Sequence, residues 1–335
     1  MAKIGDIICK KYKVLEVLGQ GGVSHVYLVE DLKLQKNWAV KEITGLQEQW
    51  FVQSVMTEIN VMKKLDHPAL PRIVDVIENG DSIYVIMDYI EGENLNSLLN
   101  KNEKISQERM LKWAKELCDV LCYLHEQKPP IIYRDMKPAN IIISHSGDVK
   151  LIDLGCAREY KEEGEEDTIN LGTRGYAAPE QFGGKGQTDV RTDIYSLGVT
   201  LYQVLTGERP WGVSEYFKRN RQGKLTAGWE YIIKKCIWKN PNLRYQSCAE
   251  LKKDLNNYEK LNKKYQKKKR WKERLKHCLK SILMLCFLSI IIFTLMENLE
   301  MLSEIIEKAE KEKIFSALKT ILDSLFQKIR EFLNL

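Results

Sequence analysis

The chain has 335 residues, of which 44% are hydrophobic and 29% are charged, and its formal net charge is +6. This mix is ordinary for a globular protein, and the length allows two domains or one domain with two lobes. The positive charge is local, because residues 261–280 hold ten Lys/Arg and one acid. The first 260 residues are close to neutral, which excludes a protein that is basic throughout.

Eight cysteines are scattered along the chain, with neither paired metal-ligand spacing nor a dense framework. Scattered thiols indicate a reducing compartment. The first six residues lack the apolar region of a secretory signal, so we do not expect the globule to be secreted. The cysteines are at positions 9, 118, 122, 156, 236, 248, 278 and 286.

The first 90 residues are predicted to form strands and one helix. Residues 51–65 have apolar side chains at helical spacing, with Val55 and Ile59 on one face. After about residue 92 the pattern is mostly helical, and one long buried face is expected from Leu111 to Leu124. The predicted strands are 12–18, 26–29, 38–43, 73–77 and 83–87.

The turn after the first strand is rich in glycine, with Gly19, Gly21 and Gly22, and a strand containing Val26 follows it. Glycine lets backbone N–H groups approach phosphate oxygens without an intervening side chain. A tight hairpin turn without a ligand has a similar sequence, so the turn alone leaves both interpretations open. A dinucleotide-binding fold requires a helix directly after the glycines, and the strand here disfavours that fold.

Residues 133–140 combine an acid, a cation and an amide between two apolar strands. Asp135 could accept a proton from a hydroxyl, Lys137 could neutralise a phosphoryl group, and Asn140 could ligate a metal ion. Asp153 follows the next strand, thirteen residues after Asn140. A short β-hairpin between them would bring both side chains to the same metal ions. A lone aspartate in a loop is more often a cap or turn residue, so the prediction depends on the combination.

In this order, the glycine-rich turn, the loop at 133–140 and the sequence Asp153-Leu154-Gly155 resemble the protein kinase family, over about residues 8–258. The Tyr-Arg-Asp and Asp-Leu-Gly variants, with a C-terminal anchor, resemble bacterial serine/threonine kinases. The resemblance implies an α+β, bilobal protein kinase fold, with a small β-rich N-lobe containing one helix and a larger helical C-lobe. A transmembrane helix and a short helical tail would follow. The implied boundaries are 8–87 for the N-lobe, 88–92 for the hinge and 93–258 for the C-lobe.

The resemblance also implies an ATP site. Lys41 would contact the α- and β-phosphates and pair with Glu58 on the following helix. Met87 would be the gatekeeper beside the adenine, and the backbones of Asp88 and Ile90 would bind the purine edge. The other residues implied for ATP are Gly19, Gly21, Gly22, Val26 and Ala39.

In the C-lobe, the resemblance implies that Asp135 and Lys137 are catalytic. Asn140 and Asp153 would bind Mg²⁺, with Mn²⁺ as an alternative. Lys137, together with Thr173 in the activation segment, is typical of serine/threonine kinases. The expected acceptors are therefore serine and threonine hydroxyls of proteins.

An Ala-Pro-Glu sequence resembles the end of a kinase activation segment. Its Glu180 is expected to pair with Arg244, and Asp193 is expected to hold the backbone of the catalytic loop. Thr168 is the candidate phosphoacceptor, and its phosphate would bind the regulatory residue Arg134 and order the loop. Thr168 lies in an acid-rich segment, residues 156–171, and the alternative for this segment is a solvated loop without a regulatory role.

Tyr133 and Leu154 depart from the family, which has His and Phe at these positions. The family's His packs near that Phe, so Tyr133 adds a ring where Leu154 removes one. The exchange compensates in volume, as a packed core would favour. We interpret Tyr133 as a change in packing and not as a sign of lost activity.

Residues 281–296 carry no charge and directly follow a basic juxtamembrane linker at 259–280. Sixteen residues span about 24 Å as a helix, and adding residues 278–280 gives a length sufficient for a slightly thinned bilayer. We predict one transmembrane helix at 281–296, in the cell membrane, with a buried helix or a hairpin anchor as the alternative. The basic residues would place the kinase domain in the cytoplasm and the tail outside. Residues 263–280 would bind anionic lipid headgroups, and no nucleic-acid partner is expected.

Residues 297–335 are predicted to form an amphipathic helical tail. Leu318, Leu322 and Leu325 step by four and three residues, as in a short coiled coil. The tail would either lie on the membrane or fold back, or it would pair two chains as a homodimer for trans-phosphorylation.

The sequence therefore predicts an active, membrane-tethered serine/threonine protein kinase that uses ATP and autophosphorylates. The alternative is a pseudokinase, which would bind ATP or a partner protein without phosphoryl transfer. The residues that transfer requires are all present, which disfavours this alternative. They are Lys41, Glu58, Asp135, Asn140 and Asp153.

Overall fold

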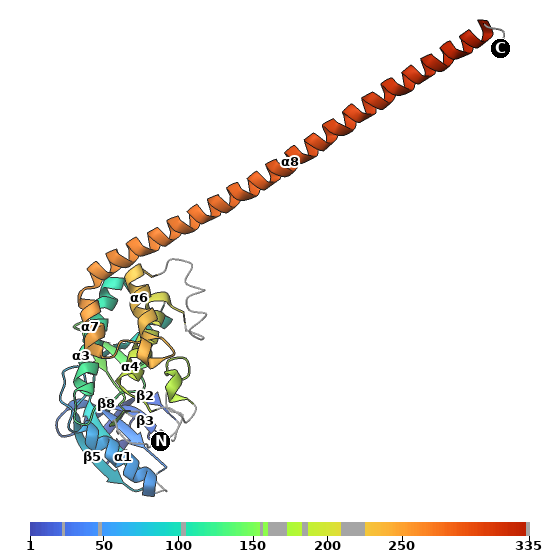
Figure 1. Ribbon diagram of the computed structural model, residues 1–335. Coiled ribbons are helices and arrows are strands. Elements are labelled where there is room, and N and C mark those ends of the chain that lie inside the picture. The colour runs from blue at the N-terminus through green and yellow to red at the C-terminus, as the bar shows by residue number, and fades with distance from the viewer. Residues whose placement is uncertain are drawn as a thin grey trace. The chain divides into compact units, whose positions relative to one another are not determined.

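The structure is a computed structural model in which the chain forms two compact units, Met1–Gln266 and Lys267–Leu335 (Figure 1). Each unit is considered by itself. The structure describes residues 1–21, 24–45, 49–101, 105–154, 157–159, 173–182, 187–208 and 225–332.

The first lobe of unit one is a six-stranded antiparallel sheet with the strand order β1-β2-β3-β4-β6-β5. Helix α1 (Gln49–Met62) packs on it, because Val55 and Ile59 form a buried cluster with Ile83 and Val85 of the sheet. The predicted helix and all five predicted strands are present, and the sheet has an additional two-residue strand at its edge. The strands are β1 (Ile7–Ile8), β2 (Tyr12–Gln20), β3 (Ser24–Asp31), β4 (Lys36–Ile43), β5 (Ile73–Asn79) and β6 (Ser82–Asp88).

A buried carboxylate lies within the first lobe. Glu42 of β4 accepts hydrogen bonds from the hydroxyls of Tyr27 at 2.7 Å and Tyr84 at 2.9 Å. Burial, and then the nearby Glu42, raise the pKa of both tyrosines to about 12. Both hydroxyls therefore stay protonated and donate, which satisfies the buried acid.

The second lobe is mainly helical (Figure 1). The predicted long face of α3 is buried from Met110 to Leu124, although Leu111 is only partly buried. The helices are α2 (Leu95–Asn100), α3 (Gln107–His125), α4 (Val190–Thr206), α6 (Ala227–Cys236) and α7 (Cys248–Asn256). Short strands complete the lobe: β7 (Gly92–Asn94), β8 (Ile131–Ile132), β9 (Ile141–Ser144), β10 (Val149–Leu151) and β11 (Arg158–Glu159).

Helix α4 is the centre of the second lobe. It begins at the N-cap Asp189, whose carboxylate accepts the Arg191 N–H at 2.7 Å, and ends at Gly207, which has a φ of 73°. Most of its residues are buried, as expected for a helix covered by protein on all sides. A Cβ on Gly198 would lie 2.4 Å from the Cβ of Cys236, so α4 and α6 are in close contact at this glycine.

The described cysteines are all free thiols. Cys118, Cys236 and Cys248 lie in the core of the second lobe, and burial raises the pKa of each thiol. These groups are neutral apolar packing residues.

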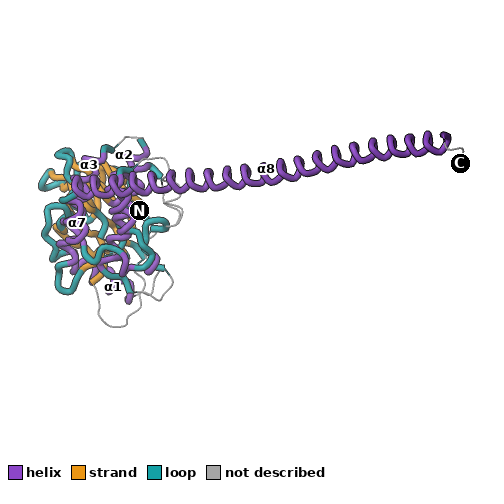
Figure 2. Tube along the Cα trace, turned by 45° about the horizontal axis from the view of Figure 1, so that its top comes forward, coloured by secondary structure: helices purple, strands orange, loops and turns teal. Residues whose placement is uncertain are grey.

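The last helix, α8 (Tyr258–Phe332), is continuous (Figure 2), and its first turns belong to unit one. The Tyr258 ring lies 5.3 Å from Trp229, and Tyr265 stacks on Tyr231 at 4.0 Å between centroids. Asn262 accepts the Gly228 N–H at 3.0 Å. These contacts anchor the start of α8 on α6 (Ala227–Cys236).

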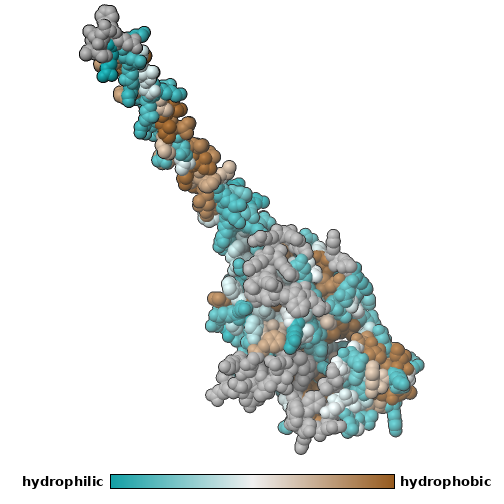
Figure 3. All heavy atoms as spheres, turned by 90° about the vertical axis from the view of Figure 1, so that its right-hand side faces the viewer, coloured by the Kyte–Doolittle hydropathy of each residue, from teal (hydrophilic) through white to brown (hydrophobic). Residues whose placement is uncertain are grey.

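In unit two, the described side chains of the helix are exposed, including the apolar ones between Ile282 and Met296. Figure 3 shows these side chains as a brown segment between hydrophilic stretches. This is the one helix among the described residues that is long and apolar enough to cross a membrane, with a mean hydropathy of 2.4 over 18 residues. The predicted fold, with a β-rich lobe, a helical lobe and a long apolar C-terminal helix, is confirmed.

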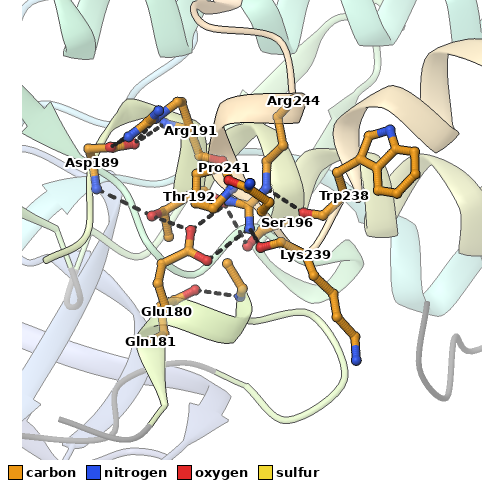
Figure 4. Close-up of polar contacts among 12 residues, drawn as sticks. Glu180, Gln181, Asp189, Arg191, Thr192, Ser196, Trp238, Lys239, Pro241 and Arg244 are labelled. Carbon is orange, nitrogen blue, oxygen red and sulfur yellow. Dashed lines mark hydrogen bonds and ion pairs between the residues drawn. The ribbon is translucent and has the colours of Figure 1, made fainter. Parts of the chain in front are cut away.

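The predicted ion pair between Glu180 and Arg244 is present and lies at the centre of a hydrogen-bond cluster (Figure 4). The guanidinium donates to both oxygens of Glu180, at 2.6 and 2.8 Å. It also donates to the carbonyls of Arg191, Trp238 and Lys239, at 2.7–3.1 Å. All five N–H donors of this fully buried side chain are therefore satisfied, and only arginine has that number.

Replacing Arg244 by methionine should lower the free energy of unfolding by about 3–5 kcal/mol, because it leaves the Glu180 carboxylate without its charge partner. Urea denaturation of unit one would measure the loss. The matched control is Lys112→Met, which removes an exposed ammonium 3.0 Å from Asp148 and should cost less than about 1 kcal/mol. Equal losses in the two variants would contradict this assignment.

Candidate active site

One buried carboxylate holds the loop between β8 and β9. Asp193 of α4 accepts the backbone N–H of Tyr133 at 2.9 Å and that of Arg134 at 2.7 Å. Nε2 of His125 lies 2.8 Å from the same carboxylate. Two turns further along α4, the Thr200 hydroxyl donates to the Met136 carbonyl at 3.2 Å. This face of α4 therefore fixes the loop backbone at both sides of Asp135.

Arg134 has a φ of 65°, which is uncommon for a residue with a side chain. Its N–H is held by Asp193, and its carbonyl accepts Nε2 of Gln181 at 3.0 Å. Gln181 is itself fixed, because the Ala178 N–H donates to its Oε1 at 2.8 Å. Contacts from two separate elements thus stabilise the left-handed conformation directly before Asp135.

Asp135 lies at the centre of a polar network. Its Oδ2 accepts from Lys137 Nζ at 2.7 Å and from Asn140 Nδ2 at 2.9 Å, and its Oδ1 accepts from the Thr173 hydroxyl at 2.9 Å. Lys137 Nζ also donates to the Thr173 oxygen at 2.8 Å. The structure therefore brings an acid, a cation and a hydroxyl of the activation segment into direct contact.

The metal-binding capacity of the site follows from the orientation of Asn140. Its amide nitrogen donates to both the carbonyl and the carboxylate of Asp135, which leaves Oδ1 as the amide atom for a cation. Asp153, after β10, supplies a carboxylate that is 45% exposed. Among the described residues, no three His, Cys, Asp or Glu side chains form a cluster. Mg²⁺ suits such a sparse set, because it takes one or two carboxylates and completes its shell with phosphates and water.

The two lobes meet at Lys41 and Asp153. Lys41 Nζ lies 2.9 Å from Asp153 Oδ1, and the two residues are 112 positions apart. Asp153 has a φ of 60°, a conformation that aspartate tolerates better than most residues. This contact joins the first lobe to the proposed metal residue of the second.

The register of the first sheet positions the residues predicted for ATP. Val26 is paired with Gly19 on one side and with Lys41 on the other, and Ala39 is paired with Met87. The Gly21 N–H donates to the Ser24 carbonyl at 2.7 Å, which closes the glycine-rich turn. Asp88 is the last residue of β6, and Ile90 follows the strand.

Several predicted residues lie outside the described part of the chain. These are Gly22, the acid-rich segment with Thr168, and the side chain of Glu58. The predicted pair between Lys41 and Glu58 and the phosphate contact of Arg134 therefore stay predictions. The Arg134 side chain itself is buried.

Tyr133 connects the catalytic loop to the segment that carries Asp153. Its hydroxyl donates to the Ile152 carbonyl at 2.5 Å. Tyr133 and Leu154 are both buried in the core cluster of the second lobe. The tyrosine therefore contributes a hydrogen bond in addition to the ring volume that the sequence suggests.

Sequence reasoning missed His125, Gln181 and the hydroxyl bond of Tyr133. His125 ends a helix and Gln181 follows Ala-Pro-Glu, so each resembles an ordinary cap or surface residue. The one available indication was their place in the chain. His125 shortly precedes the loop at 133–140, and Gln181 directly follows the Ala-Pro-Glu sequence.

A family model described as a protein kinase domain matches residues 12–284. Serine/threonine-protein kinase PknB of Mycolicibacterium smegmatis is 34% identical over 268 residues, which cover 73% of this chain and 42% of the relative. PknB of Mycobacterium tuberculosis is 34% identical over 267 residues, with the same coverage. Serine/threonine-protein kinase PrkC of Bacillus subtilis is 31% identical over 268 residues, which cover 75% of this chain and 41% of the relative. The chain spans about two fifths of the length of these curated relatives.

Removing the Tyr133 hydroxyl as Tyr133→Phe should cost about 1 kcal/mol of stability, whereas Tyr133→Ala should cost about 3–5 kcal/mol. Denaturant unfolding of both variants separates the hydrogen bond from the ring. A Phe variant as damaging as the Ala variant would show that the hydroxyl, and not the packing, dominates.

The volume exchange between Tyr133 and Leu154 has its own test. Leu154→Phe alone should destabilise the domain by about 1–3 kcal/mol, because it adds volume to a filled core. The same substitution should cost less in a Tyr133→His background, since histidine is the smaller ring. Additive losses in the double variant would show that the two side chains do not compensate for one another.

Proposed function

The chain belongs to the protein kinase family, and we propose that it transfers the γ-phosphoryl group of ATP to serine and threonine hydroxyls of proteins, including its own, from a site tethered to a membrane. The observation that carries this proposal is the network of Asp135, Lys137 and Thr173, with contacts of 2.7–2.9 Å.

Asp135 is the proposed base that accepts the proton of the attacking hydroxyl. Its Oδ1 accepts a hydroxyl hydrogen bond from Thr173, which is the interaction that a substrate hydroxyl would make. Lys137 would offset negative charge on the phosphoryl group as it moves between oxygens. The position of the Thr173 side chain between these two groups supports hydroxyl acceptors of the serine and threonine type.

Asn140 and Asp153 are the proposed ligands of the divalent cation, with Mg²⁺ or Mn²⁺ as the ion. When bound, the cation would neutralise charge on the β- and γ-phosphates. The Asn140 amide is oriented by its two bonds to Asp135, so metal ligation and the proposed base are coupled through one side chain.

The proposed nucleotide site lies on the sheet and hinge of the first lobe. Gly19 and Gly21 would cover the phosphates, and Lys41 would exchange its contact with Asp153 for the α- and β-phosphates. The adenine would lie against Ala39 and Met87. The backbones of Asp88 and Ile90 would bind its edge.

A pseudokinase is the second candidate. Such a protein commonly lacks the acid, the amide or the lysine that transfer requires, whereas Asp135, Asn140 and Lys41 are all present in this chain. The bonded geometry around Asp135 also favours transfer.

We further propose that residues 281–296 span the cell membrane. They are uncharged, and the preceding basic linker would bind anionic headgroups and keep the kinase domain in the cytoplasm. The tail after residue 297 would then lie outside, and a homodimer formed through it would bring two kinase domains together.

The Asp135→Asn variant should lose transfer by about a hundredfold or more, because the amide cannot accept the proton. Incorporation of labelled phosphate from ATP, into the protein itself and into a serine-rich substrate, measures this. Lys112→Ala is the control, since this exposed lysine lies in α3 outside the network. Equal incorporation by wild type and Asp135→Asn would overturn the proposed mechanism.

The full chain should stay with the membrane fraction after carbonate extraction, and truncation after residue 277 should release it. The physical reason is the loss of about sixteen apolar residues that the bilayer would hold. Full-length protein in the soluble fraction would contradict the proposed anchor.

A further inference from the structure

The β5–β6 pair has an unusual pattern of hydrogen bonds at its hinge end, where Arg72 precedes β5 and Asp88 ends β6. The Asp88 N–H donates to the Arg72 carbonyl at 3.0 Å. In return, the Arg72 N–H donates to Oδ2 of the Asp88 side chain at 3.2 Å. Nε of Arg72 donates to the same oxygen at 3.0 Å. One carboxylate oxygen therefore accepts both the backbone and the side chain of Arg72.

A regular antiparallel pair would be different. Directly opposed residues that bond exchange two backbone bonds, N–H to C=O in each direction. Arg72 and Asp88 continue the register of Ile73 with Met87, beyond the irregularity between Ile73 and Asp75. A regular pair at this position would have a second bond, from the Arg72 N–H to the Asp88 carbonyl. The Asp88 carboxylate takes that N–H instead, as short acidic side chains do when they compete with the backbone.

We propose that the Asp88 carboxylate and Arg72 are positioning groups that keep the Asp88 carbonyl available for the exocyclic amine of adenine. This inference rests on the proposed function, in which the Asp88 backbone binds the purine. The Arg72 guanidinium holds the carboxylate in place, and the carboxylate occupies the amide that would otherwise compete for the carbonyl.

The arrangement also determines which base fits. A carbonyl oxygen can accept from a 6-amino purine but not from a 6-oxo purine, whose own oxygen is an acceptor. A polar pair left unbonded in a closed site costs recognition. By keeping the Asp88 carbonyl available, the Arg72–Asp88 contact therefore favours ATP over inosine triphosphate, which has an oxygen in place of the amine.

The exposure of the pair indicates where its effect should be seen. The Arg72 side chain is 67% exposed and that of Asp88 is 25% exposed. Exposed ion pairs contribute little to folding stability. The main effect of the pair is therefore expected in nucleotide recognition and not in unfolding.

The experiment measures KM and kcat of the full chain with ATP and with inosine triphosphate. Asp88→Ala should raise the KM for ATP about fivefold, because the released Arg72 amide competes for the Asp88 carbonyl. The preference for ATP over inosine triphosphate in kcat/KM should narrow by a similar factor. Asp88→Asn keeps an acceptor oxygen and should retain most of the preference. Arg72→Ala should lie between the two, since the amide partner remains.

Lys112→Ala is the matched control, because it removes one partner of another exposed ion pair. Lys112 Nζ lies 3.0 Å from Asp148 Oδ1, and this pair is not part of the hinge. An unchanged ATP preference in Asp88→Ala, with wild type active, would overturn the inference and leave the proposed function intact. An equal loss of preference in Asp88→Asn and Asp88→Ala would also overturn it, because only one of them lacks the acceptor. A wild-type chain that neither binds nor uses ATP would overturn both.

Discussion

The catalytic loop depends on the buried carboxylate of Asp193. A charge removed from water is costly unless donors surround it, and here two backbone amides and the His125 ring do so. Two of these donors are the peptide groups directly before Asp135. The charge is thus satisfied only when the loop has its observed shape, including the positive φ of Arg134. The Asp193 carboxylate therefore gains its hydrogen bonds when the loop before Asp135 takes its observed conformation.

The two lobes contribute to the site in different ways. In the second lobe, side-chain hydrogen bonds from α4 and Gln181 hold the loop backbone on both sides of Asp135, and Asn140 bonds to Asp135 in turn. In the first lobe, sheet register alone places Lys41 beside Val26 and Ala39 beside Met87. A register change by one residue would turn Lys41 to the opposite face of the sheet. The contact between Lys41 and Asp153 is therefore the meeting point of two independent ordering mechanisms.

The sequence predicted much of this arrangement, because strand periodicity, glycine turns and the spacing of charged residues are local signals. The ion pair of Glu180 with Arg244 and the role of Asp193 could be predicted through resemblance, since each sits in a recognisable segment. The hydrogen bond from the Arg72 N–H to the Asp88 side chain could not be predicted. The periodicity of a strand does not show whether a backbone N–H bonds to a carbonyl or to a side-chain oxygen. The roles of His125 and Gln181 were also hidden, because each resembles an ordinary cap or surface residue in the sequence, and their partners lie 68 and 47 positions away.

The supports of the catalytic loop come late in the chain. Asp193 follows Tyr133 by 60 positions, and Arg244 follows Glu180 by 64. A growing polypeptide emerging from the ribosome therefore carries all of its proposed transfer residues well before it carries the groups that shape them. Contacts so distant in sequence form slowly compared with local ones. The loop before Asp135 can therefore take its observed shape only after the chain has been synthesised as far as α4.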